Sequence, residues 1–245
     1  MSLTDEQADN FVREKLGIPD WKTKLSTSKF ELFLEIDKRV KLEIYYEVSL
    51  CSWENEPKLL CPENVFAPYF QNITWGSKPF DQLQPPSIEE SIRLILENGA
   101  GACLQNNFVI YLLYKYLGYD TLLLGSQTFA SNVPNDHAMF IVRFPKTNMG
   151  NGPNEINFPP FKTHDYYLSD VGWVRPIPEP ILLNQLPHVF ISGGYRIEHR
   201  FNEETKMVEI HFHEGDPLKG PLVSILIPNA LVQISPFPWL FLIFV

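Results

Sequence analysis

The sequence predicts an α+β fold in which helical segments come first and strands follow. Apolar residues recur with helical spacing up to Gly118, whereas apolar and polar residues alternate along most of the later segments. Helices and strands segregated in this way are typical of α+β proteins and not of a parallel βαβ sheet. With 245 residues, of which 44% are hydrophobic and 20% charged, the chain can also bury a large core. We therefore expect a helical first half and a second half built as a sheet or barrel.

The first helix is predicted over residues 5–16. Thr4 and Gln7 form a capping-box pattern at its start, and Gly17 followed by Pro19 ends it. The next segments are less regular. Residues 28–50 mix helical and strand-like spacing and stay ambiguous, and residues 51–86 have the composition of loops and short helices.

Two further helices are predicted before the pattern changes. Ser87 with Glu90 is a second capping box, and it opens a helix that Gly99 closes. After a run of small residues, a helix is expected over 104–117, with Gly118 as its terminator.

The segments after Gly118 are predicted to be mainly strands, because β-branched and aromatic residues alternate there with polar ones. Residues 146–162 are rich in Gly, Asn and Pro and are expected to form a long loop between two strands. The predicted strands are 121–125, 138–144, 166–171, 195–200, 208–213 and 222–227.

Charge and composition exclude several classes of protein. The net charge of -9 and a pI near 5.2 argue against a nucleic-acid partner. Cys51, Cys61 and Cys103 lack the spacing of a disulfide framework or a zinc site, so we expect a reduced, cytoplasmic protein. Residues 1–10 do not resemble a signal peptide, and the apolar segment 237–245 is too short to span a bilayer.

Three residues have the right types and positions for nucleophilic catalysis. Cys103 stands where a small-residue turn enters a helix, whose N-terminus would stabilise a thiolate. His137 and Asp170 stand at strand ends, where they could serve as base and orienting carboxylate. Taken singly, each has a plainer interpretation: a small buried thiol, a surface-loop histidine and a turn-forming aspartate.

Together these segments resemble the three catalytic motifs of the arylamine N-acetyltransferases. Two supporting segments resemble the opening helix and the PFEN segment of that family. The catalytic motifs are Gly101–Asn107, Asp136–Val142 and Tyr167–Trp173, and the supporting segments are Phe11–Gly17 and Pro68–Asn72. Order, approximate spacing and flanking patterns agree over roughly residues 5–230.

The resemblance implies a helical bundle, a β-barrel and an α/β lid around a cysteine-protease-like core. Carried onto this chain, it predicts a helical domain over 1–100, with the Cys103 motif at its end. A β-barrel domain over 119–200, with the loop insertion at 146–162, and a partial lid over 201–245 would follow.

The resemblance also implies an acyltransferase activity. Acetyl-CoA would acetylate Cys103, and an arylamine or arylhydrazine would then take the acetyl group from the thioester in a ping-pong cycle. His137 would act as the base and Asp170 would hold its imidazole. No metal is required, and we expect a monomer without a membrane span.

Four more residues acquire roles through the same resemblance. Asn135 and Asp136 precede the histidine in a loop that would approach the coenzyme, although Pro-Asn-Asp is also ordinary turn composition. Trp173 and Arg175 follow the triad aspartate and would line the acceptor site, where an aromatic ring stacks on a flat amine.

The chain departs from the family pattern in four places, one of which is a longer region between Gly17 and Pro68. Gly99 stands where the family has an arginine, the loop 146–162 is an insertion, and the chain stops before the family's usual C-terminal segment is complete. Two alternatives therefore stay open. One is a Cys-His-Asp hydrolase or a transglutaminase-like acyltransferase, and the other is a catalytically impaired homologue that acts as a binding protein.

One other pair of residues could ligate a metal. His211 and His213 alternate along a predicted strand and precede Glu214 and Asp216. Because few ligands converge there, we expect a solvated strand face and no metal site.

Overall fold

The computed structural model describes the residues that form the helical region and most of the sheet. The described residues are 2–41, 88–98, 103–128, 137–146, 162–171, 179–192, 195–202, 204, 207–214 and 223–227. The predictions for residues 42–50 and for residues 51–86 therefore lie outside the described part of the chain. So do residues 147–161 of the loop predicted over 146–162.

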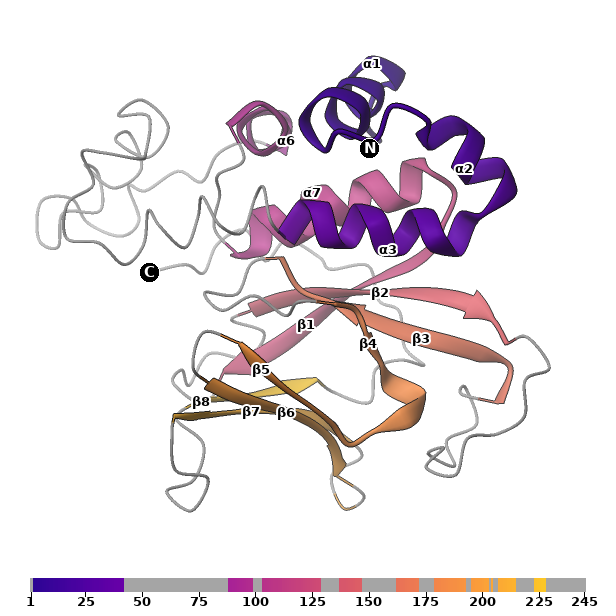
Figure 1. The fold of residues 1–245 in the computed structure, drawn as a ribbon. Helices are drawn as coiled ribbons and strands as arrows, with labels where there is room; N and C mark the ends of the chain where they lie inside the picture. The colour runs from indigo at the N-terminus through magenta and orange to yellow at the C-terminus, as the bar shows by residue number, and fades with distance from the viewer. Residues whose placement is uncertain are drawn as a thin grey trace, which may run out of the picture.

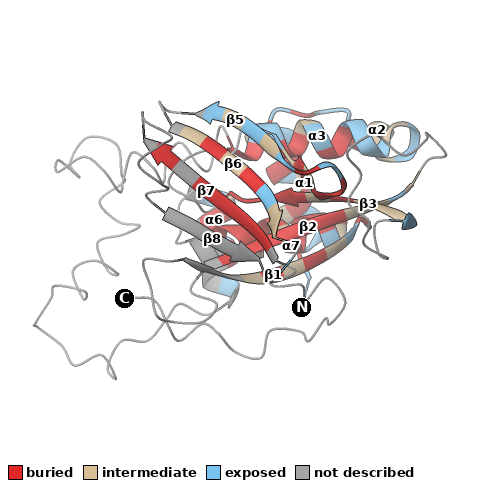
Figure 2. Ribbon diagram, turned by 90° about the horizontal axis from the view of Figure 1, so that it is seen from below, coloured by how far each residue is buried: buried red, intermediate tan, exposed pale blue. Residues whose placement is uncertain are grey.

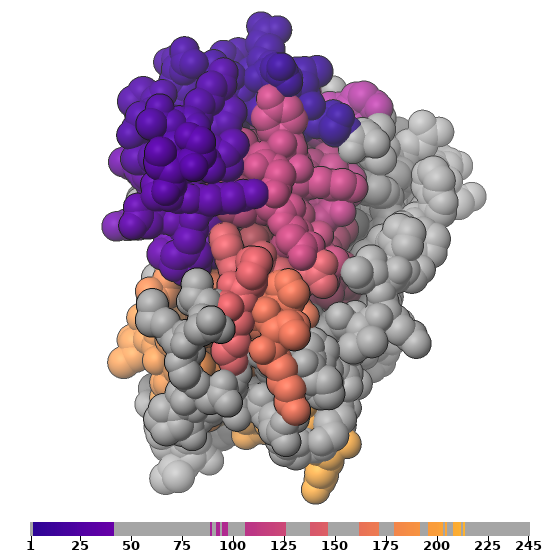
Figure 3. All heavy atoms as spheres, turned by 90° about the vertical axis from the view of Figure 1, so that its right-hand side faces the viewer, coloured from indigo at the N-terminus to yellow at the C-terminus, as the bar shows by residue number. Residues whose placement is uncertain are grey.

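A layer of helices covers one side of a sheet, which confirms the α+β prediction (Figure 1). In the space-filling view the N-terminal helices lie against α7 at one end of the molecule, with strands at the other end (Figure 3). The helices are α1 (Asp5–Asn10), the π-helix η1 (Phe11–Lys15), α2 (Trp21–Thr27), α3 (Lys29–Val40), α6 (Ile88–Asn98) and α7 (Cys103–Tyr116). Of the described helices, none combines the length and apolar composition that crossing a bilayer requires.

The predicted first helix is present, and its second half is a π-helix. The capping box forms as predicted: the Gln7 amide donates to Thr4 Oγ1 at 3.2 Å, and the Thr4 amide donates to Gln7 Oε1 at 2.9 Å. Gly17, with φ +64°, ends this helical run, and Gly118, with φ +75°, ends α7. Both glycines adopt the left-handed conformation that other residues rarely tolerate.

The strands form one antiparallel sheet with the order β4-β3-β2-β1-β8-β7-β6-β5. All six predicted strands are present. β4, β5 and the 3₁₀ turn η5 (Leu183–Gln185) were not predicted. The strands are β1 (Asp120–Thr128), β2 (His137–Pro145), β3 (His164–Ser169), β4 (Ile181–Leu182), β5 (His188–Ser192), β6 (Tyr195–Asn202), β7 (Met207–Glu214) and β8 (Val223–Ile227).

The predicted β-barrel is not closed over the described strands. β4 and β5 are the two edges of the sheet and are neighbours in sequence, yet no ladder joins them. β4 has only two residues, and the prolines directly before β4 and β5, Pro180 and Pro187, have no N–H group to donate. Because β7 and β8 belong to the same sheet as β6, the sheet continues past residue 200.

The sheet is buried on both faces along β2, which explains the unbroken apolar run of that strand. Phe140 and Val142 belong to the core between helices and sheet, whereas Met139 and Ile141 belong to a second core inside the curve of the sheet. Buried residues run along β2 in the view from below (Figure 2). A strand covered on both faces needs apolar residues at every position and not at alternate ones.

An aromatic cluster around Phe33 packs α3 against α7 and the sheet. The ring of Phe33 lies 5.5 Å from Tyr114, 5.3 Å from Phe144 and 5.8 Å from Tyr167, between centroids. The Tyr119 hydroxyl adds a hydrogen bond of 2.8 Å to the carbonyl of Lys29, at the first turn of α3. These contacts set the position of α3 relative to β3.

Candidate active site

The backbone places the three candidate catalytic residues at the ends of three adjacent elements. Cys103 is the first residue of α7, His137 is the first residue of β2, and Asp170 directly follows β3. β2 and β3 pair antiparallel with Phe140 opposite Ser169, so the start of β2 lies beside the end of β3. These are the positions that the sequence predicted for the three residues.

Asn107 connects all three elements through its side-chain amide. Its Nδ2 donates to the carbonyl of Ala138 and to Asp170 Oδ1, each at 2.8 Å, and its Oδ1 accepts from the amide of Val171 at 3.0 Å. Asn107 lies one helical turn after Cys103, so the two positions share one side of α7. One buried amide therefore ties the helix of Cys103 to the residue after His137 and to Asp170.

Asp170 is held in a fully buried position. Its exposed fraction is 0%, as is that of Asn107. A buried carboxylate requires hydrogen-bond donors, because burial removes the water that would otherwise solvate its charge. The Asn107 amide is one such donor, and it fixes the direction of Asp170 Oδ1 from the α7 side.

Sequence reasoning did not single out a second buried polar group beside this site. Asp37 of α3 is 1% exposed and Lys41 is 4% exposed, and Lys41 Nζ lies 2.6 Å from Asp37 Oδ2. Asp37 Oδ1 accepts a hydrogen bond from the hydroxyl of Ser169, the residue before Asp170. Burial raises the pKa of Asp37, while the Lys41 ammonium and the Ser169 hydroxyl oppose that rise.

Asp37 could have been found from its position in the sequence. The buried stripe of α3 is Leu32, Phe33, Ile36, Asp37 and Val40, so a carboxylate stands on the apolar face of an amphipathic helix. Asn107 gives a similar signal, because it is a polar residue in a helix that is apolar on most sides. In both cases the buried polar group predicts an internal partner.

His199 of β6 is a further buried titratable group near Asp170. It is fully buried, its ring stacks on Phe190 at 5.6 Å, and neither ring nitrogen has a hydrogen-bond partner among the described residues. Burial lowers the pKa of His199 to about 3. The charge of Lys41 adds to that lowering and the charge of Asp170 opposes it. The imidazole is therefore neutral at physiological pH.

The remaining candidate site residues lie outside the described part of the chain. Asn135 and Asp136 fall in the segment 129–136, and Trp173 and Arg175 fall in the segment 172–178. Their coenzyme and acceptor roles therefore stay predictions. Gly99, where the family has an arginine, also lies outside the described residues.

The predicted solvated face at His211 and His213 is wrong, because both side chains are buried. They do share a face, with their rings stacked at 6.2 Å. His211 Nε2 contacts Glu209 Oε2 at 2.8 Å, whereas His213 Nε2 lies 3.9 Å from Glu198 Oε2. Within the described part of the chain, no cluster of three or more His, Cys, Asp or Glu side chains is arranged to hold a metal.

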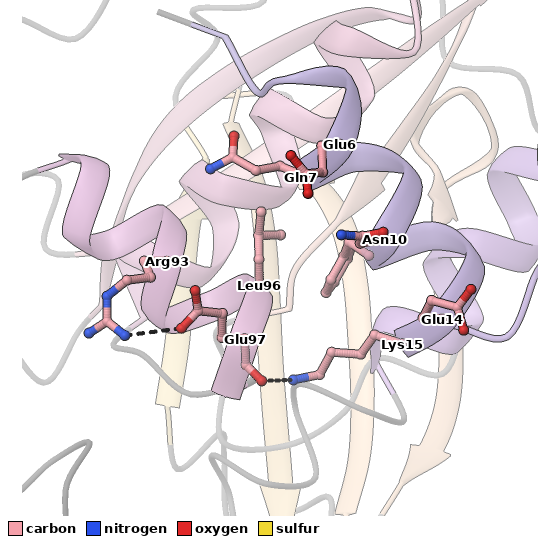
Figure 4. Close-up of a pocket in the computed structure, with 9 residues that line it drawn as sticks. Glu6, Gln7, Asn10, Glu14, Lys15, Arg93, Leu96 and Glu97 are labelled. Atoms are coloured by element: carbon pink, nitrogen blue, oxygen red, sulfur yellow. Dashed lines mark hydrogen bonds and ion pairs between the residues drawn. The ribbon is translucent and has the colours of Figure 1, made fainter.

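A separate hollow of about 550 Å³ lies between α1, η1 and α6 (Figure 4). Two of its cationic side chains bind Glu97: Arg93 Nη1 lies 3.0 Å from Glu97 Oε2, and Lys15 Nζ donates to the Glu97 carbonyl at 3.1 Å. None of the candidate catalytic residues lines it. The lining residues are Glu6, Gln7, Asn10, Phe11, Glu14, Lys15, Arg93, Leu96 and Glu97.

Comparison with known proteins gives matches among solved structures alone. No family model matches the chain, and no curated protein matches it. The structure is similar to the arylamine N-acetyltransferase from Mycobacterium abscessus, with 18% identity and a TM-score of 0.41, over 58% of this chain and 45% of that one.

Two further solved structures give similar values. Arylamine N-acetyltransferase C from Bacillus anthracis is 11% identical with a TM-score of 0.40, over 63% of this chain and 54% of that one. The Nocardia farcinica arylamine N-acetyltransferase is 19% identical with a TM-score of 0.35, over 56% of this chain and 48% of that one. The match therefore spans about half the length of each of these proteins.

Proposed function

We propose that the protein transfers an acetyl group from acetyl-CoA to an arylamine or arylhydrazine through a thioester on Cys103. The observation that carries the proposal is the set of hydrogen bonds of Asn107, which gathers the three predicted catalytic segments around one buried amide. The choice of donor and acceptor rests on the resemblance of those segments to the arylamine N-acetyltransferase motifs.

In the first half-reaction, His137 takes the proton of the Cys103 thiol. The thiolate attacks the carbonyl carbon of acetyl-CoA, the bond from that carbon to the coenzyme sulfur breaks, and the coenzyme thiol leaves with the proton. In the second half-reaction, the amine nitrogen attacks the thioester carbonyl and the bond from that carbon to the Cys103 sulfur breaks. The proton that the amine gives to His137 passes to the departing Cys103 sulfur. The enzyme returns to its starting state.

The helix and the buried carboxylate both favour this chemistry. Cys103 begins a helix of 14 residues, and the partial positive charge of that helix end stabilises a thiolate. Asp170 would stabilise the imidazolium of His137, and the bond from Asn107 would keep the carboxylate oriented toward that task. Backbone N–H groups at the start of α7 would receive the developing oxyanion.

The decisive experiment is intact-mass spectrometry of the purified protein after brief exposure to acetyl-CoA. We expect a gain of one acetyl group in the wild type, no gain in Cys103→Ala, and loss of the adduct when 4-aminobenzoic acid is added. Cys51→Ser/Cys61→Ser is the matched control, because it removes the other two cysteines and should acetylate like the wild type.

Other outcomes separate the alternatives. An adduct that water discharges as fast as the amine would favour the hydrolase interpretation, because a thioester can pass its acyl group to several nucleophiles. An unmodified, folded wild type across several acyl-CoA donors would refute the acetyltransferase. If its thiol also reacts slowly with iodoacetamide, an impaired homologue becomes the better interpretation.

A further inference from the structure

We propose that the buried ion pair of Asp37 and Lys41 is a positioning device for Asp170, acting through the hydroxyl of Ser169. The inference rests on the proposed function, because it assigns the pair a role in the reactivity of Cys103. Asp37 and Lys41 would not touch the substrate, so they are positioning residues.

The pair reaches the candidate site through the backbone. Asp37 divides its two oxygens between two partners: Oδ2 faces the ammonium of Lys41 at 2.6 Å, and Oδ1 accepts from the Ser169 hydroxyl. Ser169 ends β3 and immediately precedes Asp170. The last residue of the strand is therefore bound from the α3 side, and Asn107 binds Asp170 and Val171 from the α7 side.

The position of α3 makes this contact well defined. Phe33 lies one turn before Asp37, and its ring packs 5.8 Å from the ring of Tyr167 on β3. Phe30 packs on the same ring at 5.2 Å. Tyr167 and Ser169 are two residues apart, so both lie on the face of β3 that meets α3. Apolar packing thus already holds α3 against β3, so the ion pair is not needed for this contact.

An ion pair at this depth needs an explanation other than stability. Removing two charges from water costs more than a typical pair returns, so apolar residues of similar volume would serve the core as well. What a carboxylate adds is direction, because it can accept from the ammonium and the hydroxyl only in a narrow range of geometries. The pair therefore fits a site that needs an accurately placed strand end.

The pair lies close to Asp170 because Ser169, which donates to Asp37 Oδ1, is the residue before Asp170. The charges of Lys41 and Asp170 act in opposite directions on the pKa of His199: Lys41 lowers it and Asp170 raises it. Within the described part of the chain, the titratable groups that interact electrostatically with Asp37 are Lys41 and, from α7, Tyr114. From the helical layer, Asp170 is held by the Asn107 amide.

The test measures the rate at which iodoacetamide alkylates Cys103 as a function of pH, in a Cys51→Ser/Cys61→Ser background. The alkylation midpoint is the pH at which the rate reaches half of its maximum. A low midpoint in the parent protein reports a thiolate that its base and carboxylate stabilise. We expect Ser169→Ala to raise that midpoint, so that alkylation at about pH 6 slows roughly tenfold. Ser169→Thr keeps the hydroxyl and should restore the parent profile.

Two more variants separate positioning from general stability. Asp37→Leu/Lys41→Met removes both charges at similar volume, and we expect it to raise the midpoint by the amount expected for Ser169→Ala. This variant keeps the test available if Ser169→Ala does not fold. Tyr119→Phe removes the hydrogen bond at the other end of α3 and should leave the profile unchanged.

The outcomes distinguish the two proposals. A parent protein whose Cys103 alkylates like a free thiol would defeat the proposed function and, with it, this inference. A low parent midpoint that stays unchanged in both Ser169→Ala and Asp37→Leu/Lys41→Met would overturn the positioning role alone and leave the proposed function standing.

Discussion

Two buried polar clusters in this molecule are built in opposite ways. The hydrogen bonds of Asn107 join residues that are 31, 63 and 64 positions apart in sequence. The hydrogen bonds of Glu209, on β7, reach His211, Asn202 and Arg200, which are 2, 7 and 9 positions away. The first cluster connects a helix with two strands, whereas the second stays within one hairpin.

The difference indicates what each cluster can do. Long-range bonds fix the relative positions of elements that no turn connects, which is what a site assembled from several segments requires. Local bonds strengthen a hairpin whose register its own ladder already sets. Changes at Asn107 should therefore affect both stability and reactivity, whereas changes at Glu209 should affect stability alone.

The largest effect is expected for Asn107→Leu. The change leaves Asp170, the Ala138 carbonyl and the Val171 amide without this partner, at a cost of roughly 3–5 kcal/mol in unfolding free energy. Misplacement of Asp170 should also slow acetylation of Cys103 by about a hundredfold. Urea unfolding and the rate of adduct formation measure the two effects.

Asn184→Leu is the matched control for that variant. Asn184 is also buried, accepts from the Tyr166 amide and donates to the His164 carbonyl, each at 2.9 Å, far from the end of β3 that carries Asp170. It should lose roughly 2–4 kcal/mol and still acetylate at the rate of the wild type. Equal rates in the two variants would remove the distinction between the clusters.

The next largest effect is expected at low pH, where protonation of His199 lowers the free energy of unfolding. Burial lowers the pKa of His199 from 6.5 in the unfolded chain to about 3 in the folded protein. The stability that the neutral ring contributes is present above pH 6.5 and is lost as the pH falls toward 3. By about pH 4 the loss reaches about 3 kcal/mol.

His199→Leu isolates that contribution. Urea unfolding at about pH 7 and pH 4 should show a smaller acid loss in the variant than in the wild type, by about 3 kcal/mol. Equal acid losses in both proteins would mean that another group carries the acid sensitivity.

Glu209→Gln should have a smaller effect that is confined to the hairpin. Burial alone would raise the pKa of Glu209, but hydrogen bonds from Asn202, His211 and Arg200 lower it to about 2. Its contribution is therefore present above pH 4.5 and disappears as the pH falls toward 2. At neutral pH the variant should lose about 1–2 kcal/mol in urea unfolding, and acetylation of Cys103 should not change.

Ile191→Thr should have the smallest effect, although it lies in the same half of the sheet. Ile191 is on the edge strand β5 and is 78% exposed, so its truncation removes little buried area. The free energy of unfolding should change by less than about 0.5 kcal/mol. A larger loss in thermal or urea unfolding would indicate that this edge is covered in solution.

The elements that were predicted from the sequence are those with local causes. The capping box at Thr4, the glycines after α1–η1 and α7, and the alternation along β6 and β7 all depend on residues close in sequence. β4 and β5 were not predicted, because β4 is too short to show an alternating pattern and the prolines near it favour a loop. The closed barrel was wrong for the same reason, since closure depends on a ladder between these two strands.

The candidate site was predicted in part. The positions of Cys103, His137 and Asp170 at element ends follow from the sequence pattern, and their catalytic roles stay predictions. The connecting residues were missed. The bond between Ser169 and Asp37 joins residues 132 positions apart, and no local pattern identifies the partner of a buried carboxylate. Only its unexpected place on an apolar helix face marks Asp37.

The strand order also determines when β1 can pair with β8 during synthesis. β1 pairs with β8 at Gln127–Leu226 and Thr128–Ile225, so the end of β1 is synthesised about 100 residues before this partner exists. A ribosome that adds 5–20 residues per second needs about 5 to 20 seconds for that length. Throughout that interval the end of the nascent β1 has unpaired backbone groups, which another chain could pair with.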